Sequence, residues 1–323
     1  MTSSLLAQTR KLAYHFNVKY LSCLAAYLVS AFVLVAAEVK VAALHPLLGD
    51  MARKIGGEQV EVVDLLKPAG NLHAFEPTTR EMAAASGARL VLASGKQLEP
   101  YLGRLKDSLP ATARILDLGA SVPDVPVQDG EAHADHEHEH EHNGDCCNHG
   151  PNDPHWWHTP GNMKRAARSL AAELSKLDPE HATSYKENLK QWNREMDELN
   201  AWARSTVAAI PAENRVLVTG HAAMGHFCKE YGFRMIPIQG ISREDEGNTA
   251  RLASILARLR EQKIPAIFTE VNASPKMLDT IARQLGVPTA PLITDGLSAD
   301  RHDFPSMFRY NVETMQKLLQ NKK

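Results

Sequence analysis

The sequence predicts an α/β protein with two lobes, each with a parallel sheet of about four strands, joined by one long rigid helix. Three observations support this fold class. Short runs rich in aliphatic and β-branched residues alternate with runs of helical apolar spacing. The short runs form two groups of four. A long stretch of helical periodicity separates the groups, so each group is expected to build its own sheet.

The expected strands lie at regular intervals within each group. The first group comprises residues 39–44, 60–66, 89–94 and 114–118, and the second comprises residues 215–219, 235–239, 266–271 and 289–294. Helical spacing between the strands is clearest at residues 78–86 and 249–262. The first of these helices begins with Thr78 followed by Glu81, the pattern of a capping box. Alternating strands and helices are typical of parallel sheets.

The region between the groups, residues 161–210, has two successive helical patterns. Apolar residues recur at helical spacing from Met163 to Leu177 and again from Tyr185 to Leu199. Asp178 and Pro179 interrupt the run and form a plausible helix start. We interpret the aromatic and methionine residues of this stripe as core packing, and the region as a rigid connection between the lobes.

The N-terminus has the composition of a signal peptide. Arg10, Lys11 and Lys19 precede an uncharged apolar run at residues 21–37, which ends in the small residues Ala36 and Ala37. We therefore expect residues 1–37 to be removed. The alternative is a membrane anchor that is not cleaved, because the run is about as long as a short membrane span. Cys23 stands at the start of the run, where it cannot serve as the lipidated cysteine of a lipoprotein.

Composition excludes several classes of function. The net charge of −2 provides no basic surface for nucleic acid. Three cysteines follow the predicted signal peptide and form no evident disulfide framework. The 15 histidines of the chain are unusual. Residues 124–154 lack apolar periodicity and contain six of these histidines: His133, His136, His138, His140, His142 and His149.

This His-rich loop is expected to bind Zn²⁺ weakly and to serve in metal sensing or metal gathering. The alternative is a solvated low-complexity segment without a selected function. Loops of this length inside a compact domain are usually functional.

Four other side chains form the expected metal site: His73, His155, His221 and Asp295. Three of them follow predicted strands, and ligands of open α/β sheets bind at the carboxyl ends of strands. The fourth, His155, lies at the crossing between the lobes. Three imidazoles and one carboxylate suit Zn²⁺, and imidazole also binds Cu²⁺, Fe²⁺ and Ni²⁺. Each histidine taken alone could equally be a structural polar residue.

Weaker candidates lie near these four. Glu270 ends a predicted strand and is expected to accept a hydrogen bond from a ligand imidazole, with direct coordination as the alternative. His158 is three residues from His155 and could share its helical face. The alternative, which we favour for both His158 and His226, is a supporting or surface histidine. His45, after the first strand, is interpreted as structural.

Five segments resemble the zinc/manganese solute-binding proteins of ABC importers, and most closely the periplasmic zinc receptors. GNLHAFEPT at 70–78 resembles their G-x-x-P-H-x-Y-E-P-T segment, and DPHWW at 153–157 resembles D-P-H-x-W. TGHAAMG at 219–225 resembles T-x-H-x-A-F-x-Y. IFTE at 267–270 and LITD at 292–295 match the last two signatures. The chain departs from the pattern at Leu72, where proline is usual, at His158, where an aliphatic residue is usual, and at His226, near a usual aromatic residue.

The resemblance implies two α/β lobes joined by one long helix, with His73, His155, His221 and Asp295 as ligands. It implies a periplasmic or extracellular protein that captures Zn²⁺ and delivers it to a membrane permease, acting as a monomer without nucleic acid. Mn²⁺ is the alternative metal, although the acidic His-rich loop is typical of zinc members. The expected domains are a signal peptide (1–37), a first lobe (38–159, with the loop 124–154), linking helices (160–210) and a second lobe (211–323).

Two other functions are compatible with a zinc site. One is a zinc-dependent hydrolase, although a catalytic zinc keeps an open position and the sequence lacks H-E-x-x-H and a nucleophile elbow. The other is an extracellular zinc store or adhesin on the same fold. Four protein ligands favour binding without turnover.

Overall fold

The computed structural model describes residues 39–68, 70–127, 151–238 and 249–320, with side chains at 249–252 left out. The chain divides into residues 1–37 and 38–323, and the second unit contains every described residue. The predicted signal peptide and the six loop histidines lie outside the described ranges. None of the described helices combines the length and the apolar character that a membrane crossing requires.

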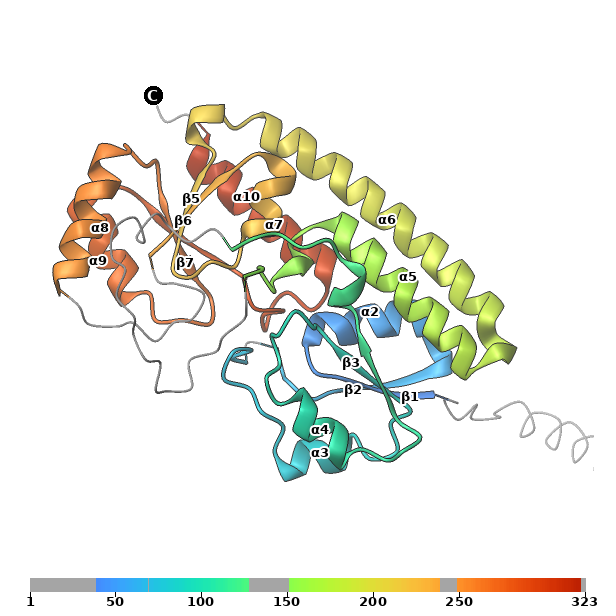
Figure 1. Ribbon diagram of the computed structural model, residues 1–323. Coiled ribbons are helices and arrows are strands. Elements are labelled where there is room, and N and C mark those ends of the chain that lie inside the picture. Colours follow the sequence, from blue (N-terminus) through green and yellow to red (C-terminus); the bar gives the residue numbers. More distant parts are fainter. Residues whose placement is uncertain (1–38, 69, 128–150, 239–248, 321–323) are drawn as a thin grey trace, which may run out of the picture. The chain divides into compact units, whose positions relative to one another are not determined.

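The first lobe contains a four-stranded parallel sheet in the order β2-β1-β3-β4 (Figure 1). Its strands are β1 (Val39–Ala43), β2 (Val60–Asp64), β3 (Leu90–Ala93) and β4 (Arg114–Asp117). Its helices are α2 (Pro46–Gly56), α3 (Thr79–Ala84) and α4 (Leu102–Ser108). The central strands β1 and β3 are almost entirely buried, as expected for a parallel sheet covered on both faces.

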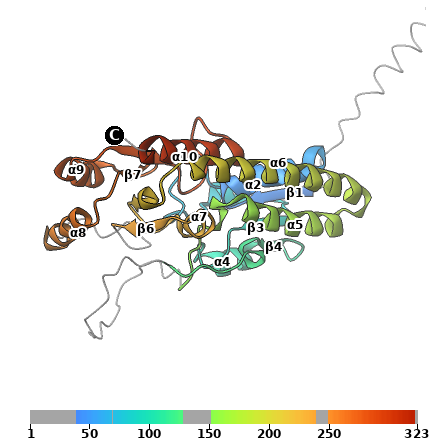
Figure 2. The same ribbon diagram turned by 90° about the horizontal axis from the view of Figure 1, so that it is seen from above.

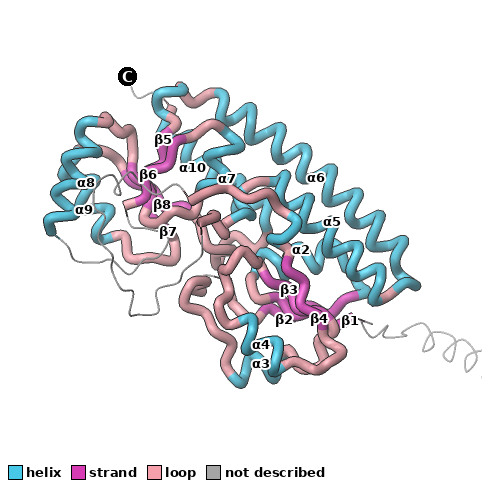
Figure 3. The backbone as a smooth tube through the Cα atoms, in the orientation of Figure 1, coloured by secondary structure: helices cyan, strands magenta, loops and turns pink. Residues whose placement is uncertain are grey.

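The second lobe repeats this arrangement, with a parallel sheet in the order β6-β5-β7-β8 (Figure 3). Its strands are β5 (Val216–Thr219), β6 (Arg234–Pro237), β7 (Ile267–Glu270) and β8 (Thr289–Leu292). Its helices are α7 (Gly225–Tyr231), α8 (Thr249–Glu261), α9 (Lys276–Leu285) and α10 (Phe304–Leu319). Because the strands are parallel, the loops after β5 and β8 leave the sheet at the same edge.

Two helices, α5 (Pro160–Leu177) and α6 (Ala182–Ala208), join the lobes and lie side by side (Figures 1 and 2). The connection is thus a helical hairpin, whose longer member α6 packs on α2 of the first lobe and α10 of the second. Thr159 caps α5, since its side chain accepts the backbone N–H of Asn162 at 3.2 Å. The predicted interruption at Pro179 is present as a short 3₁₀ turn between the helices.

One apolar cluster connects the two lobes through the helical hairpin. It includes Val41 of β1, Leu170 of α5, Met196 of α6 and Phe308 of α10, all nearly inaccessible to solvent. Trp156 and Trp157, at the crossing between the lobes, are also fully buried in it. The lobes therefore share a core and are not separate bodies on a flexible tether.

The observed strands begin and end within two residues of the predicted ones. Seven of the eight end earlier than expected. Three of them end two residues early: β2 at Asp64, β6 at Pro237 and β8 at Leu292. At β8 the chain leaves the ladder to enter the loop that contains Asp295. Short 3₁₀ segments complete the fold: η1 (Gly57–Gln59), η2 (Gly119–Ser121), η3 (Trp156–His158), η4 (Pro179–His181) and η5 (Ala212–Asn214).

Candidate metal centre

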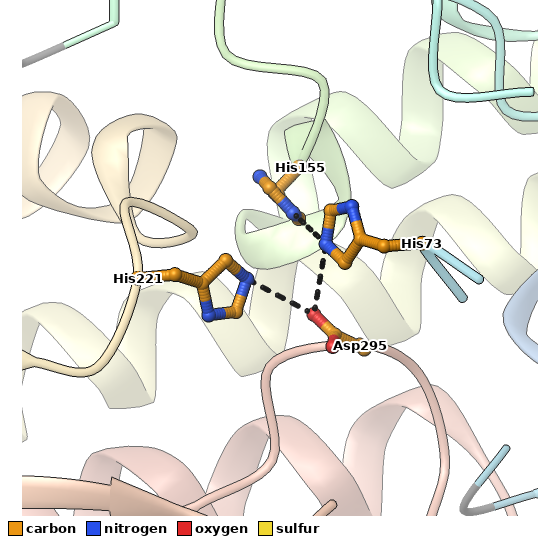
Figure 4. Close-up of side chains that lie close together, drawn as sticks. All are labelled: His73, His155, His221 and Asp295. Carbon is orange, nitrogen blue, oxygen red and sulfur yellow. Dashed lines mark hydrogen bonds and ion pairs between the residues drawn. The ribbon is translucent and has the colours of Figure 1, made fainter. Parts of the chain in front are cut away.

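Four side chains from four separate segments converge between the lobes (Figure 4). They are His73 from the loop between β2 and α3, His155 before η3, His221 after β5, and Asp295 after β8. One potential ligand atom from each lies within 4.8 Å of the other three. The structure thus brings together all four residues that were predicted from the sequence as metal ligands.

Three of the distances between these atoms are close to those of a tetrahedral ion site. Nε2 of His73 lies 3.1 Å from Nε2 of His155 and 3.8 Å from Oδ1 of Asp295. Nε2 of His221 lies 3.3 Å from the same Oδ1. A tetrahedral zinc with bonds of about 2.0–2.2 Å separates its ligand atoms by about 3.3–3.6 Å. The arrangement can accept a small divalent cation with little rearrangement.

Only one of the four side chains is accessible to solvent. The side chains of His155, His221 and Asp295 are inaccessible, whereas that of His73 is 8% exposed. We therefore expect an incoming ion to meet His73 first.

An asparagine shapes the turn that carries His73. Oδ1 of Asn71 accepts the backbone N–H of His73 at 3.1 Å and that of Ala74 at 3.3 Å. Leu72, between them, is buried in the core. The leucine anchors the turn by packing at the position where the resembling proteins have proline, while Asn71 satisfies the exposed N–H groups.

His155 is oriented by the carboxylate of Asp153. Oδ1 of Asp153 accepts the backbone N–H of His155 at 2.9 Å and lies 2.8 Å from its Nδ1. The proton therefore resides on Nδ1, and Nε2 presents its lone pair to the centre. Burial lowers the pKa of His155 to about 4, against the opposing effect of Asp153. His155 is neutral and ready to bind a cation at physiological pH.

The other oxygen of Asp153 reaches the second lobe. Oδ2 accepts the backbone N–H of Gly225 at 2.9 Å, at the start of α7. A Cβ at position 225 would lie 2.5 Å from this oxygen, so only glycine fits. Burial alone would raise the pKa of Asp153, but its bonds to His155 hold it near 2. One ionised carboxylate thus orients a candidate ligand and joins the lobes.

His221 has an equivalent partner in Glu270. Oε1 of Glu270 lies 2.7 Å from Nδ1 of His221 and accepts its backbone N–H at 3.0 Å. Burial would lower the pKa of His221, but Glu270 and Asp295 outweigh it and raise the pKa to about 10. Without metal, His221 therefore holds a proton between two carboxylates, which a cation must displace.

Asp295 is positioned by residues of both lobes. Asn311 of α10 binds the backbone of Ile293 through both its amide nitrogen and oxygen, at 2.8 and 2.9 Å. The carbonyl oxygen of Thr294 accepts a hydrogen bond from Nε1 of Trp157 at 3.0 Å and lies 2.9 Å from Nε2 of His158, within hydrogen-bond distance. Burial would raise the pKa of Asp295, but His221 and His73 hold it well below its usual range.

The weaker candidates lie around the four-residue cluster. His158 is buried, and its Nε2 is occupied by the Thr294 carbonyl. His226 lies between the Asp153 carbonyl, 3.2 Å from Nε2, and the Asn162 amide, 3.1 Å from Nδ1. Glu270 contacts His221 and is not among the converging ligand atoms. The loop histidines at 133–149 fall outside the described residues.

Sequence reasoning did not assign roles to Asp153, Asn71 and Asn311. Asp153 was recognisable, because a carboxylate two residues before a candidate histidine ligand often holds its other nitrogen. Asn311 lies 16 residues from Asp295 on a helix with an ordinary apolar pattern, and no local feature of the sequence indicates its contact with Ile293.

The sequence was compared with known families. The family described as zinc-uptake complex component A, periplasmic (ZnuA), matches residues 41–318. The chain belongs to the ZnuA family. This family consists of substrate-binding proteins of metal importers and not of enzymes, so the hydrolase alternative is wrong.

Curated relatives support the assignment over most of their lengths. The zinc-uptake protein ZnuA of Bacillus subtilis is 31% identical over 243 residues, 75% of this chain and 74% of that protein. The iron-binding protein YfeA of Yersinia pestis is 26% identical over 87% of this chain and 86% of its own length. The manganese-binding lipoprotein MntA of B. subtilis is 26% identical over 87% of this chain and 90% of its own. Relatives of this ZnuA-family chain are thus named for three different metals.

Solved structures confirm the two-lobe fold. The periplasmic zinc-binding protein TroA of Treponema pallidum aligns with a TM-score of 0.75 and 23% identity, over 88% of this chain and all of that one. A crystal structure of ZnuA aligns with a TM-score of 0.74 and 24% identity, over 87% and 99%. The family match makes the chain a metal-binding receptor of the ABC-importer class.

Proposed function

We propose that this ZnuA-family receptor captures Zn²⁺ through His73, His155, His221 and Asp295 and delivers it to the permease of an ABC importer. The observation that carries this proposal is the convergence of three imidazole nitrogens and one carboxylate oxygen within 4.8 Å. Four protein ligands complete the coordination of Zn²⁺ and leave no position for a reactive water. Such a site binds an ion without catalysing a reaction.

The nature of the ligands favours zinc over manganese. Three of the four are nitrogen atoms, and Mn²⁺ prefers carboxylate, carbonyl and water oxygens. An additional carboxylate beside the centre, Glu270, already accepts from the backbone nitrogen and Nδ1 of His221. A small, buried centre also suits an ion that takes four ligands. The relatives named for iron and manganese make the choice of metal the point that needs measurement.

The decisive experiment is a competition titration on residues 38–323 after removal of bound metal with a chelator. We expect one tight Zn²⁺ per chain that excess Mn²⁺ does not displace. Preferential retention of Mn²⁺ would contradict the proposed metal, and the absence of a tight site for either would contradict the proposed residues. His221→Glu is an informative companion, because replacing nitrogen with oxygen should move the preference toward Mn²⁺.

Delivery requires a partner in the membrane. We propose that the receptor acts as a monomer outside the cytoplasm, with residues 38–159 and 211–323 as lobes on either side of the linking helices at 160–210. The test is reconstitution of the receptor with a candidate permease in vesicles that contain a zinc-sensitive dye. We expect uptake with the parent protein and none with His155→Ala. Uptake that is equal with and without the receptor would contradict this role.

A further inference from the structure

His45 is a fully buried histidine beside the metal centre with no evident structural role. It follows β1 and occupies the N-cap position of α2, but its side chain makes no capping hydrogen bond. Within the described part of the chain, neither Nδ1 nor Nε2 has a hydrogen-bond partner. The carbonyl of Asp295 faces the ring without forming a hydrogen bond of normal geometry.

Such a residue is energetically unfavourable in a folded protein. A buried polar group left without a partner destabilises the folded state, whereas an apolar residue of the same shape does not. An unpaired buried group therefore calls for a ligand, a water molecule or a second state in which it is paired. Packing alone does not require an imidazole at position 45. The ring packs against Trp157 with centroids 4.6 Å apart and planes tilted by 39°, as a phenyl ring could.

The tip of the ring points toward the chain at Asp295. A Cβ on Gly296 would lie 3.1 Å from Nε2 of His45, so the glycine leaves the space that the imidazole fills. The φ of Gly296 is +126°, a conformation in which other residues are strained. His45 thus stands directly behind the segment that presents the Asp295 carboxylate to the ion.

The division of ligands between lobes suggests when His45 acts. His73 and His155 come from the first lobe and its crossing segment, whereas His221 and Asp295 come from the second. An ion that loses its second-lobe ligands keeps only two bonds. His45 belongs to the first lobe and would supply a third.

We propose that His45 is a reserve ligand. Its imidazole binds the transported ion when the Asp295 carboxylate dissociates from it, and so stabilises an intermediate of metal uptake and release. This inference rests on the proposed function, because it assumes that the ion occupies the four-residue centre. A ligand that lowers the barriers between the bound and free states speeds exchange in both directions without changing the equilibrium. His45 therefore controls the rate of transfer and not the affinity.

His45→Phe tests this proposal, since it keeps the stacking on Trp157 and removes both nitrogens. Zn²⁺ release is followed by stopped flow into a fluorescent chelator, with rates extrapolated to zero chelator. We expect association and dissociation both to slow by about tenfold while Kd stays within about threefold of the parent value. The metal-free variant should melt at the parent temperature or above it, because an unpaired buried group has been removed.

X-ray absorption spectroscopy of the zinc-loaded proteins gives an independent readout. In Asp295→Ala the ion loses its carboxylate ligand, so the reserve ligand should replace it and zinc should have four imidazole ligands in that variant. The double variant Asp295→Ala with His45→Phe should return to three imidazoles and an oxygen. The single and double variants both lack the Asp295 carboxylate, so they differ only at position 45. Their zinc ligands can therefore be compared even if His45→Phe changes the stability of the protein.

The outcomes separate this inference from the proposed function. Unchanged exchange rates in His45→Phe, or three imidazoles in Asp295→Ala, would overturn the reserve ligand and leave the four-residue site intact. A large loss of affinity in His45→Phe would show a permanent ligand and would also overturn it. A parent protein without a tight zinc site would overturn both.

Discussion

The Oε1 atom of Glu270 lies 2.7 Å from Nδ1 of His221, and the same oxygen accepts the backbone N–H of that histidine. This pair fixes both the orientation and the tautomer of the imidazole. The carboxylate also increases the basicity of the nitrogen that faces the ion. Glu270 thus acts on the metal through His221.

Glu270→Gln should weaken Zn²⁺ binding by about 10- to 100-fold, the range seen when a carboxylate partner of a ligand histidine is lost. The amide can still accept one hydrogen bond, so the fold should persist. Competition titration measures the affinity, and circular dichroism checks the fold. Glu261→Gln is a suitable control, because Glu261 is an exposed residue at the end of α8. Equal affinities for the two variants would contradict this role of Glu270.

Alanine substitution of His73, His155 or His221 should each weaken Zn²⁺ binding by about 100-fold or more, because each removes one of four bonds. His302→Ala removes an exposed histidine away from the cluster and should bind like the parent. Isothermal titration calorimetry with a competing chelator measures these affinities. If two of the three variants bound as tightly as His302→Ala, the proposed ligand set would be wrong.

Zinc binding should release about one proton per ion at pH 7.5. His221 has a pKa raised to about 10 in the metal-free centre, so it remains protonated well above neutral pH. Affinity should rise about tenfold per pH unit between roughly pH 6 and 9 as proton competition falls. Calorimetry in buffers of different ionisation enthalpy counts the protons, and a flat affinity with no release would contradict this prediction.

The same ion pair affects the stability of the metal-free protein. The pKa of His221 is higher in the folded state than in the unfolded state, where it is near 6.5. Protonation of His221 therefore contributes fully to folding stability below pH 6.5, and this contribution disappears as the pH rises through about 10. Thermal melts of the metal-free protein should therefore show a loss of stability above neutral pH that is smaller in His221→Asn. A loss equal in both proteins would exclude His221 as its cause.

Bound zinc should raise the melting temperature, because its ligands come from both lobes and from segments far apart in sequence. Only the folded state offers this site, so saturating metal stabilises it by linkage. Differential scanning fluorimetry with and without Zn²⁺ tests this. Asp295→Ala should reduce the shift. An unchanged parent melting temperature at saturating Zn²⁺ would contradict a site between the lobes.

Deletion of residues 128–150 should lower the number of zinc ions bound while leaving the tightest site unchanged. The expectation rests on composition, because histidines on a polar segment must lose conformational entropy to chelate an ion. Calorimetry on the deletion variant counts the sites and their affinities. Loss of the tightest phase would place the main site in the loop and not at His155 and its neighbours.

The lobes, the strands and the four converging residues could be predicted because each has a local signal. Buried parallel strands are continuous apolar runs, and the residue after such a strand lies at the ligand-binding edge of the sheet. Asp295 and His221 follow strands and were located in this way. The interruption at Pro179 was equally visible, because proline cannot continue a helix.

Other features depend on contacts between distant segments. The pairing of α5 with α6 as a hairpin follows from apolar faces that could have packed elsewhere. The bond from Asp153 to Gly225 joins residues 72 positions apart. The burial of His45 without a partner is likewise a property of the assembled centre, since its sequence neighbours indicate only a helix start.

The single exposed edge at His73 has a consequence for the water that an ion brings with it. A hydrated cation reaches His73 first and must exchange water for the buried ligands one at a time, with the carboxylate of Asp295 among the enclosed ones. We expect this order of exchange to disfavour ions that lose hydration water reluctantly, as Mg²⁺ does. Discrimination against Mg²⁺ would then begin with dehydration, before any comparison of bond strengths at the centre.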